Sequence, residues 1–411
     1  MGAAFNHRIE VFMRLPSVRG YVAMGTLWRH EHDYKYQYAD GYLRRDDAIP
    51  VDPVTLPLTD IEFSSCVLFS ALRDAAADRW GRRVLGCIAD IQPDHLDELD
   101  VLSAVHQPLR IGALAFGRSP DQPESCAPWA TPDIIVPHDL RMVANAVAQI
   151  DGLDEDASES VSHTSKDTLL AVLGPSLSLG GARPKALVWM DDESWIAKFS
   201  SCEDVWREPV IEHATMTLAA KCGMNVAQTI LHEVDEQAIL LVKRFDRQNG
   251  TPRHFVSAFT VTGLAEDGGW KSYQHLADQA RRLGDVESGP EIFRRMVFNA
   301  LCSNRDDHLR NHAFFVTRDR IVMTPAYDLV PSAIRCKSWN LSLACGLEGR
   351  AATKMNLLSS VQPFGLSDLE AGRIWDEMKA VVADWRAHFW DCGVNQAEID
   401  ELSHRFVLAD S

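Results

Sequence analysis

The chain has 411 residues, a formal net charge of −17, 46% hydrophobic residues and 24% charged residues. This length predicts two or three domains, and the composition is typical of a globular protein. No run of about 18 uncharged apolar residues occurs, which argues against a transmembrane helix. The acidic balance argues against unaided binding to DNA or to an anionic membrane. Nine scattered cysteines without a C-x-x-C pair are typical of reduced thiols and favour a cytoplasmic location.

The first hundred residues predict mainly β-strands. Apolar residues alternate over 8–15, and the stretches 20–28 and 34–38 follow with turn signals between them. The stretch 66–81 has the apolar spacing of a single helix. A further strand is predicted over 109–116.

The middle of the chain contains two breaks in composition and then a sharper pattern. The stretch 117–129 is rich in Pro and Ser, and 151–167 is acidic and rich in Ser, so both predict exposed loops. Two short strands joined by D-D-E-S predict a hairpin over 185–199. An amphipathic helix is predicted over 205–222, and a buried strand over 238–245.

The second half of the chain is mainly helical in pattern. Ser288 and Glu291 have the spacing of a capping box and predict the start of a helix. The polar loop N-R-D-D-H-L-R-N-H over 304–312 follows, then a short hairpin, and the tail from about 366 is again helical. Strands, a helix, a strand and then mostly helices are the element order of a two-lobed, kinase-like α+β fold.

The polar loop carries the residues with the clearest chemistry. Phosphoryl transfer needs an acidic group at the acceptor hydroxyl and hard oxygen ligands for magnesium. Asp306 and Asn311, five residues apart, followed by Asp328 beyond the hairpin, supply both. A zinc site formed by His308 and His312 is the weaker alternative, because no glutamate stands between them and the segment does not read as a helix. Either aspartate by itself reads more simply as a turn residue.

Three further features fit a nucleotide site, although each is weak alone. Gly180 and Gly181 predict a backbone that can approach phosphate oxygens, but a Gly-Gly turn before a strand is more often only a turn. Lys198, near the end of the next strand, can reach phosphates as a point charge, with Glu212 of the following helix as its partner. The stretch 242–246 is a possible hinge that binds adenine through its backbone.

In this order the motifs resemble the HipA family, the kinase toxins of bacterial type II toxin–antitoxin systems. G-T-L-W and Y-A-D-G-Y-L are similar to the family's N-terminal subdomain, and S-L-G-G-A-R-P-K-A is similar to its Gly-rich loop. W-I-A-K-F, L-V-K-R-F-D-R, N-R-D-D-H-L-R-N-H-A-F-F and T-P-A-Y-D-L-V follow in family order. The resemblance spans nearly the whole chain and implies a fold shared with protein kinases and lipid kinases. Arg183-Pro184 departs from the more polar pair that is common in the family.

The resemblance implies a role for each matching residue. Asp306 is the proton acceptor, and Asn311 and Asp328 hold Mg²⁺. Glu212, the partner expected for Lys198 from the strand-then-helix order, would position the lysine. Contacts to ATP are implied for Gly180, Gly181, Ala182, Arg183, Pro184, Lys185, Lys198, Lys243, Phe245, His308 and Tyr327. Asp246 is expected at the ribose from its position at the end of the hinge stretch 242–246. Autophosphorylation, which ejects the Gly-rich loop in family members, is implied at Ser178 or Ser176. Asp307 and His312 are left as structural neighbours.

The function implied is a Mg-ATP-dependent serine/threonine protein kinase. Its implied target is a cellular protein such as glutamyl-tRNA synthetase, and its implied partner is a helix-turn-helix antitoxin that supplies the contact with DNA. We expect a β-rich subdomain over 1–110, an N-lobe over 111–245 and a helical C-lobe over 246–411. The alternatives are a lipid or small-molecule kinase on the same fold, and a pseudokinase that acts only as a co-repressor.

Overall fold

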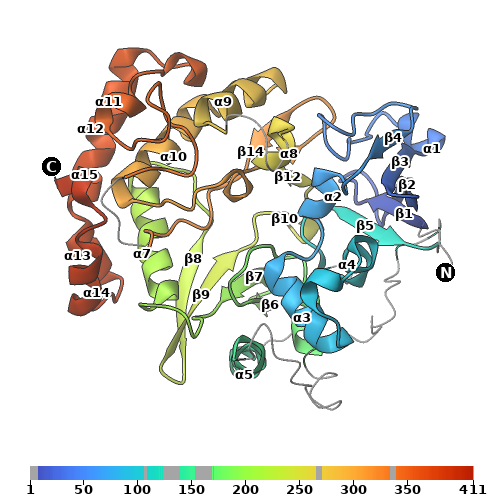
Figure 1. Ribbon diagram of the computed structural model, residues 1–411, viewed down its shortest axis with the longest axis horizontal. Helices are drawn as coiled ribbons and strands as arrows, with labels where there is room; N and C mark the ends of the chain where they lie inside the picture. The colour runs from blue at the N-terminus through green and yellow to red at the C-terminus, as the bar shows by residue number, and fades with distance from the viewer. Residues whose placement is uncertain are drawn as a thin grey trace.

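The computed structural model describes most of the chain. The described residues are 8–105, 109–119, 121, 123, 139–152, 169, 171–264, 271–333 and 339–410. Most of the acidic loop predicted at 151–167, and much of the loop predicted at 117–129, lies outside these ranges. In Figure 1 the N-terminal sheet and the C-terminal helices lie at opposite ends of the long axis, with a second sheet between and below them.

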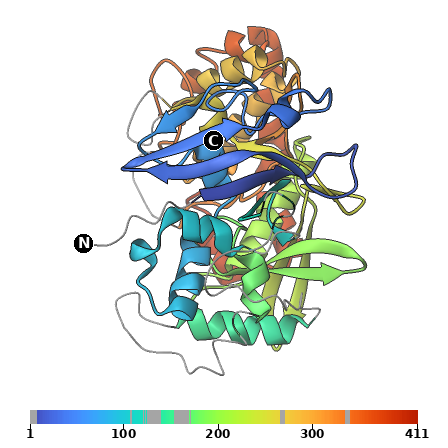
Figure 2. The ribbon, with the colours of Figure 1, turned by 90° about the vertical axis from the view of Figure 1, so that its right-hand side faces the viewer.

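The N-terminal part is built on a five-stranded antiparallel sheet of order β4-β3-β2-β1-β5. Its strands are β1 (Arg8–Met13), β2 (Val22–His30), β3 (Asp33–Tyr38), β4 (Phe63–Ser65) and β5 (Leu114–Gly117). The strands predicted near the N-terminus are therefore present. β5 pairs with β1 although it lies beyond the boundary expected at residue 110. Figure 2 shows this sheet from the side, with helices of the same part below it.

One predicted helix is wrong. The stretch 66–81 forms two helices, α2 (Ser70–Asp74) and α3 (Arg79–Ala89), instead of one. Ala75, Ala76 and Ala77 are buried in the turn between them, and Asp78 has an extended backbone that starts α3 anew. The other helices of this region are α1 (Asp40–Leu43), η1 (Pro93–His95), α4 (Glu98–Ala104) and α5 (Leu140–Asp151).

The second sheet has four antiparallel strands in the order β6-β7-β9-β8. They are β6 (Lys185–Met190), β7 (Glu193–Lys198), β8 (Thr229–Val234) and β9 (Gln237–Lys243), preceded by η3 (Gly174–Ser176). The β6–β7 hairpin turns at Asp191 and Asp192, whose φ values of 51° and 60° match the right-handed twist of its strands. Helix α7 (Glu208–Lys221) packs against β8 and β9, so it lies beside the strand that ends in Lys198.

The C-terminal part is mostly helical around a small sheet of order β12-β13-β14. The three strands of this sheet are β12 (Phe255–Ser257), β13 (Ala313–Val316) and β14 (Ile321–Met323), and β10 (Arg247–Gln248) pairs separately with β11 (Thr251–Pro252). Its helices are α8 (Ala258–Thr262), α9 (Tyr273–Arg282), α10 (Gly289–Cys302), η4 (Leu309–Asn311), α11 (Lys354–Leu357), η5 (Gln362–Phe364), α12 (Asp368–Ala383), α13 (Trp385–Asp391), α14 (Gln396–Leu402) and α15 (Val407–Asp410).

The capping box predicted at Ser288 is absent. Ser288 has helical backbone angles and makes no side-chain cap bond to α10. Its hydroxyl donates instead to Asp285 Oδ2 at 2.5 Å, while Glu291 accepts from the guanidinium of Arg295 at 3.1 Å. The helix still begins where the spacing predicts, because Pro290 at its first turn needs no hydrogen-bond acceptor for its nitrogen.

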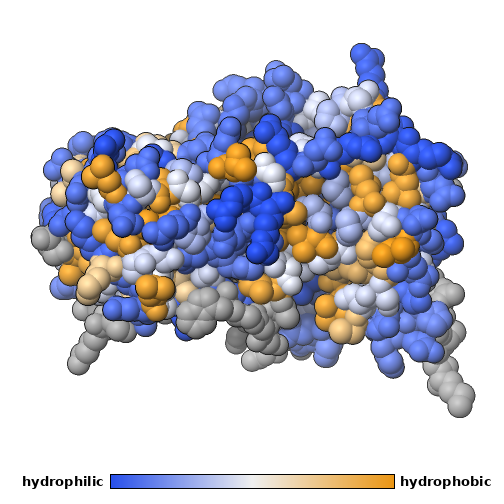
Figure 3. All heavy atoms as spheres, turned by 90° about the horizontal axis from the view of Figure 1, so that it is seen from above, coloured by the Kyte–Doolittle hydropathy of each residue, from blue (hydrophilic) through white to orange (hydrophobic). Residues whose placement is uncertain are grey.

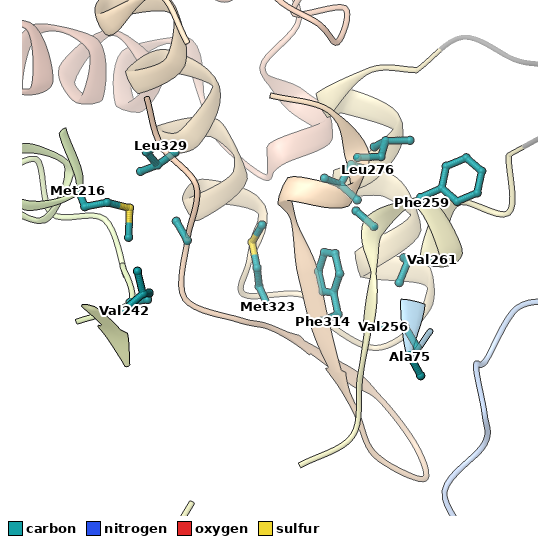
Figure 4. Close-up of a cluster of buried hydrophobic side chains, with 14 of the residues drawn as sticks. Ala75, Met216, Val242, Val256, Phe259, Val261, Leu276, Phe314, Met323 and Leu329 are labelled. Carbon is teal, nitrogen blue, oxygen red and sulfur yellow. The ribbon is translucent and has the colours of Figure 1, made fainter. Parts of the chain in front are cut away.

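Buried apolar side chains from all three parts form one continuous cluster. Figure 4 shows Val256 and Phe314 of the small sheet beside Leu276 of α9, with Ala75 of the N-terminal part in the same cluster. On the face seen in Figure 3, hydrophilic groups dominate and hydrophobic ones are scattered among them. Within the described ranges, none of the helices has the length and apolar content needed to cross a membrane.

Candidate active site

Lys198 lies where three separate elements meet. It is the last residue of β7, and its Nζ donates to Glu212 Oε1 at 2.6 Å and to Asp328 Oδ1 at 2.7 Å. Glu212 comes from the buried face of α7, and Asp328 follows β14 with a φ of 60°. This left-handed backbone at a non-glycine residue is rare and turns the carboxylate of Asp328 toward the lysine.

The electrostatics favour an ionised lysine between two carboxyl groups. The charge of Lys198 lowers the pKa of Asp328 well below its usual range, even though burial opposes this shift. Burial alone would lower the pKa of Lys198, but Asp328 and Glu212 raise it above its ordinary value. Burial raises the pKa of Glu212, and Lys198 offsets part of that rise. Asp328 therefore keeps its charge, with 46% of its side chain exposed to solvent and ligands.

The loop 304–312 begins directly after α10 and presents Asp306 on its surface. Ser303 ends the helix in a left-handed conformation, with a φ of 55°. The Asn311 side-chain amide then donates to the Asp306 carbonyl oxygen at 3.0 Å, which closes the loop on itself. Partial burial raises the pKa of the Asp306 carboxyl, while His308 opposes and Asp328 reinforces the rise. Asp306, Asn311 and Asp328 are thus brought to one place from two segments.

A buried polar network holds this loop from beneath. The Asp307 carboxylate is 1% exposed, accepts a hydrogen bond from the Tyr273 hydroxyl, and lies 3.0 Å from His312 Nε2. The Asn299 amide donates to the Tyr273 oxygen at 3.3 Å and extends the network into α10. Tyr273 was missed by sequence reasoning, because a tyrosine at the start of α9 gives no signal that it meets residue 307.

The Gly-rich loop has the backbone that its sequence predicts. Gly180 and Gly181 have φ values of 72° and 77°, a conformation that side chains rarely adopt. The Lys185 ammonium donates to the Gly180 carbonyl oxygen, and burial together with the charge of Lys198 lowers the pKa of Lys185 to about 8. Ala182 and Pro184 belong to the same loop. Lys185 therefore points toward the group around Lys198 rather than into solvent.

Arg183 ties the other end of this loop to the start of α7. Its guanidinium pairs with Asp204, and also with Glu208 at 3.0 Å. Burial raises the pKa of Glu208 to about 7, although Arg183 lowers it. Arg183, which departs from the common family pattern, is thus paired with two acidic side chains.

Both candidate autophosphorylation serines are buried. Ser178 is 1% exposed, and its hydroxyl oxygen accepts from the Ile111 N–H at 3.0 Å. Ser176 is 2% exposed, and its hydroxyl oxygen accepts from the Leu187 N–H at 2.7 Å. Neither hydroxyl is presented to an incoming phosphoryl group in this arrangement.

The N-terminal part also forms hydrogen bonds to the Gly-rich loop. Sequence reasoning missed the residues that make them. Asp78 Oδ2 accepts from the Gly181 N–H at 3.0 Å. The Trp80 backbone N–H donates to the Gly181 carbonyl oxygen at 3.1 Å, and its indole N–H donates to the Lys185 carbonyl oxygen at 2.9 Å. These residues precede the loop by about a hundred positions, so only the fold reveals the contact.

Phe245 of the predicted hinge lies against Tyr327, which follows β14. The Phe245 ring lies 5.6 Å from the Tyr327 ring, centre to centre. Lys243 pairs with Glu193 at 2.6 Å, in the sheet next to this ring pair. Tyr327 donates its hydroxyl to the Arg310 carbonyl oxygen at 2.8 Å, so it joins the hinge to the loop 304–312.

Asp246 is placed differently from its predicted role at the ribose. It is 3% exposed, and it accepts from the Gly112 N–H at 2.7 Å, from Arg244 at 2.7 Å and from Arg247 at 2.7 Å. These partners lower the pKa of Asp246 to about 2, against the effect of burial. These three bonds go to Oδ2, and Oδ1 accepts from Arg244 Nε at 2.9 Å. Because both oxygens are engaged, we assign Asp246 to the junction with the N-terminal part and not to ribose binding.

The donor set fits magnesium rather than zinc. The Asn311 Oδ1 and the Asp328 carboxylate are hard oxygen ligands of the kind that magnesium takes together with phosphates. His312 Nε2 lies against Asp307, whereas His308 is exposed. No group of three or more His, Cys, Asp or Glu side chains among the described residues is arranged to hold a metal ion.

Comparison with known proteins decides the family. The family model described as HipA-like C-terminal domain matches residues 177–385, which is half of the chain. The chain belongs to the HipA family. The match contains the Gly-rich loop, Lys198 and the loop 304–312, so the HipA motifs and the cluster described above coincide.

Two curated relatives agree with this assignment. The chain is 26% identical over 193 residues to a serine/threonine-protein kinase toxin HipA of Shewanella oneidensis, covering 38% of this chain and 43% of that relative. It is 30% identical over 155 residues to a putative kinase, Y4dM, of Sinorhizobium fredii, covering 33% of this chain and 37% of that relative. The matched stretches thus span less than half the length of either relative.

A solved structure extends the similarity to the whole fold. A chain of the Shewanella oneidensis toxin–antitoxin complex of HipA, HipB and operator DNA superposes with a TM-score of 0.67 at 18% identity. The superposition covers 98% of this chain and 95% of that chain. The predicted two-lobed, kinase-like α+β fold of the HipA family is therefore confirmed.

Proposed function

We propose that this HipA-family chain is a Mg-ATP-dependent serine/threonine protein kinase. The observation that carries the proposal is the position of Lys198 between Glu212 and Asp328, beside the loop that presents Asp306. Phosphoryl transfer depends on positioning and electrostatic stabilisation, and these groups supply both a fixed cation and oxygen ligands. The curated relatives that share this region are named as a kinase toxin and a putative kinase.

When bound, ATP supplies the γ-phosphoryl group, and Mg²⁺ neutralises part of its charge. Asn311 and Asp328 would hold the metal through their side-chain oxygens, and Lys198 would meet the phosphates as a cation. Asp306 would accept the proton of a serine or threonine hydroxyl. Its raised pKa makes the carboxylate a better proton acceptor than an ordinary surface aspartate. His308 lies next to it and lowers that pKa in turn.

We further propose that the Gly-rich loop, Phe245 and Tyr327 bind the rest of the nucleotide. The left-handed glycines let backbone N–H groups face phosphate oxygens. The aromatic pair formed by Phe245 and Tyr327 offers an apolar surface for the adenine. Lys243 would lie near the same part of the nucleotide, with its ammonium paired with Glu193 and its N–H donated to the Gln228 carbonyl oxygen at 2.9 Å.

Autophosphorylation is proposed as the off-switch. Ser178 or Ser176 would receive phosphate only after leaving the buried positions described above. A phosphate adds about two negative charges to the serine. The phosphorylated serine could not return to its buried position, and its charge would repel the phosphates of ATP. Phosphorylation would therefore keep the loop away from the nucleotide.

The wider biological role follows the same proposal. The structural neighbour was solved with HipB and operator DNA, which supports a DNA-binding antitoxin as the partner of this chain. We propose a cytoplasmic toxin kinase whose target is a cellular protein, with glutamyl-tRNA synthetase as the first to test. We also propose three parts, with the first boundary placed after β5 rather than at residue 110, because β5 completes the N-terminal sheet.

The experiment is incubation of cell lysate with γ-labelled ATP, magnesium and the purified chain. The proposal predicts label in one or a few protein bands, and no label when Asp306→Asn replaces the wild type. Label in the lipid fraction would favour a lipid kinase on the same fold. Failure to consume ATP, with retained binding to an antitoxin, would favour a pseudokinase co-repressor.

A further inference from the structure

The carboxylate of Asp78 contacts the Gly-rich loop at a backbone N–H group, which is the kind of group that binds phosphate in such loops. The N–H groups of such loops serve as donors to phosphate oxygens. Here the Gly181 N–H donates to Asp78 Oδ2 at 3.0 Å. A carboxylate oxygen and a phosphate oxygen are both anionic acceptors, and a single N–H favours only one at a time.

The start of α3 is pressed firmly against the same loop. The Trp80 N–H holds the Gly181 carbonyl oxygen, and the Trp80 indole holds the Lys185 carbonyl oxygen. A side chain at Gly81 would place its Cβ 2.2 Å from the Leu177 carbonyl oxygen, so only glycine permits this approach. Asp78 is therefore kept at Gly181 by a packed helix end, and not by the chance position of a surface side chain.

Asp78 is both charged and accessible. Burial would raise the pKa of its carboxyl, but hydrogen bonds from the N–H groups of Gly181 and Arg79 lower it below its ordinary value. The charges of Arg310 and Lys185 act in the same direction. The residue is nevertheless exposed. A negative charge at the mouth of a phosphate loop repels an incoming polyphosphate.

We propose that Asp78 competes with the phosphates of the nucleotide for the Gly181 amide and so lowers the affinity of the kinase for ATP. This inference rests on the proposed nucleotide site. It makes Asp78 a positioning residue outside the segment 177–385 that defines the family match. The N-terminal part would thereby set the nucleotide concentration at which the loop engages phosphate.

The test is calorimetric titration of the purified chain in the presence of magnesium. The three ligands are ADP, a non-hydrolysable ATP analogue and adenosine. Asp78→Asn keeps an oxygen for the Gly181 N–H but removes the charge. We expect its Kd for ADP and for the analogue to fall about three- to tenfold, in line with loss of one charge-assisted competitor. Adenosine, which lacks phosphates, should bind as it does to the wild type.

The matched control is Asp94→Asn, which removes one exposed charge from η1 of the same part and should leave all three Kd values unchanged. Unchanged or weaker ADP binding by Asp78→Asn would overturn the inference, because it would mean that Asp78 only braces the loop. An equal gain for adenosine would overturn it as well. If the wild-type chain bound neither nucleotide, the proposed function itself would fail, and a melting curve for each variant separates both outcomes from misfolding.

Discussion

Two loops lie near the Lys198–Asp328 ion pair but are held in different ways: the loop 304–312 brings Asp306 near Asp328, and the Gly-rich loop 176–185 brings Lys185 near Lys198. The first rests on a buried network within the C-terminal part, in which Asp307 is fixed by Tyr273 and lies against His312. The second is held by contacts from elsewhere in the chain, at Asp78, Trp80 and Ile111. One loop is therefore built to stay in place, whereas the other can be released by breaking a few hydrogen bonds.

This difference fits the two tasks. A proton acceptor and metal ligands must keep their positions to within fractions of an ångström, and a buried network provides that. A loop that covers phosphates must admit the nucleotide and, under the proposed function, leave after phosphorylation. Substitutions in the first loop should therefore change chemistry, and substitutions around the second should change affinity and loop position.

The largest effect is expected from Asp306→Asn. Loss of the proton acceptor should reduce kcat by about 10²- to 10⁴-fold. The melting temperature should stay the same, because the loop is closed through the Asp306 backbone oxygen and not through its carboxylate. Steady-state phosphorylation assays check this, with the exposed Asp319→Asn in the β13–β14 turn as control. Retained activity would remove Asp306 from the site.

The next largest effect is expected from Glu212→Gln. The amide keeps the shape of the side chain but no longer balances the charge of Lys198, so kcat/KM should fall about 10- to 100-fold. Stability should change little, because burial already disfavours the carboxylate, as its raised pKa indicates. Kinetics and urea unfolding of the same preparation separate the two effects. A large loss of stability with unchanged kcat/KM would make Glu212 a packing residue only.

Glu208 offers a pH test on the side of the Gly-rich loop. Its folded pKa of about 7 lies above its ordinary value of 4.5, so its stabilising contribution is full below the unfolded pKa and is lost as the pH rises through 7. Glu208→Gln stays neutral at every pH. The free energy of unfolding of this variant, relative to that of the wild type, should therefore rise by about 2–3 kcal/mol between pH 5 and pH 8.5. Urea unfolding at both pH values measures the difference. Parallel pH profiles would show that Glu208 is already well solvated or fully paired.

The smallest effect is expected from Tyr273→Phe. Removal of the hydroxyl leaves Asp307 short of one donor and should lower the free energy of unfolding by about 1–2 kcal/mol. If the network positions Asp306, kcat should also fall severalfold while KM for ATP stays the same. Tyr34→Phe in β3, distant in sequence from the loop, is the control. A change in KM alone would place the network under the nucleotide and not under the catalytic loop.

The sequence was informative wherever function depends on local spacing. The sequence allowed us to group Asp306, Asn311 and Asp328, because one short loop carries the first two and a short hairpin leads to the third. It also allowed us to pair Lys198 with Glu212, because the strand that ends at the lysine is followed by the helix that carries the glutamate. The contact between Lys198 and Glu212 is present at 2.6 Å. Their catalytic roles stay predictions until they are measured.

The rest depended on contacts between distant segments. Asp78 lies 103 residues before Gly181, and nothing in its neighbourhood distinguishes it from any other aspartate that starts a helix. Asp246 looked free to bind ribose because its partners Gly112 and Arg244 become visible only in the fold. The single helix expected over 66–81 failed for a related reason, since three buried alanines favour both a helix and a tightly packed turn.

The most direct test of the kinase proposal is mass spectrometry of the purified chain after incubation with Mg-ATP. It involves both loops, because Asp306 on one must act on a serine of the other. We predict phosphate on Ser178 or Ser176 in the wild type, with none in Asp306→Asn or when EDTA removes magnesium. Phosphate absent from every serine and threonine of the wild type, or unchanged in Asp306→Asn, would contradict the account.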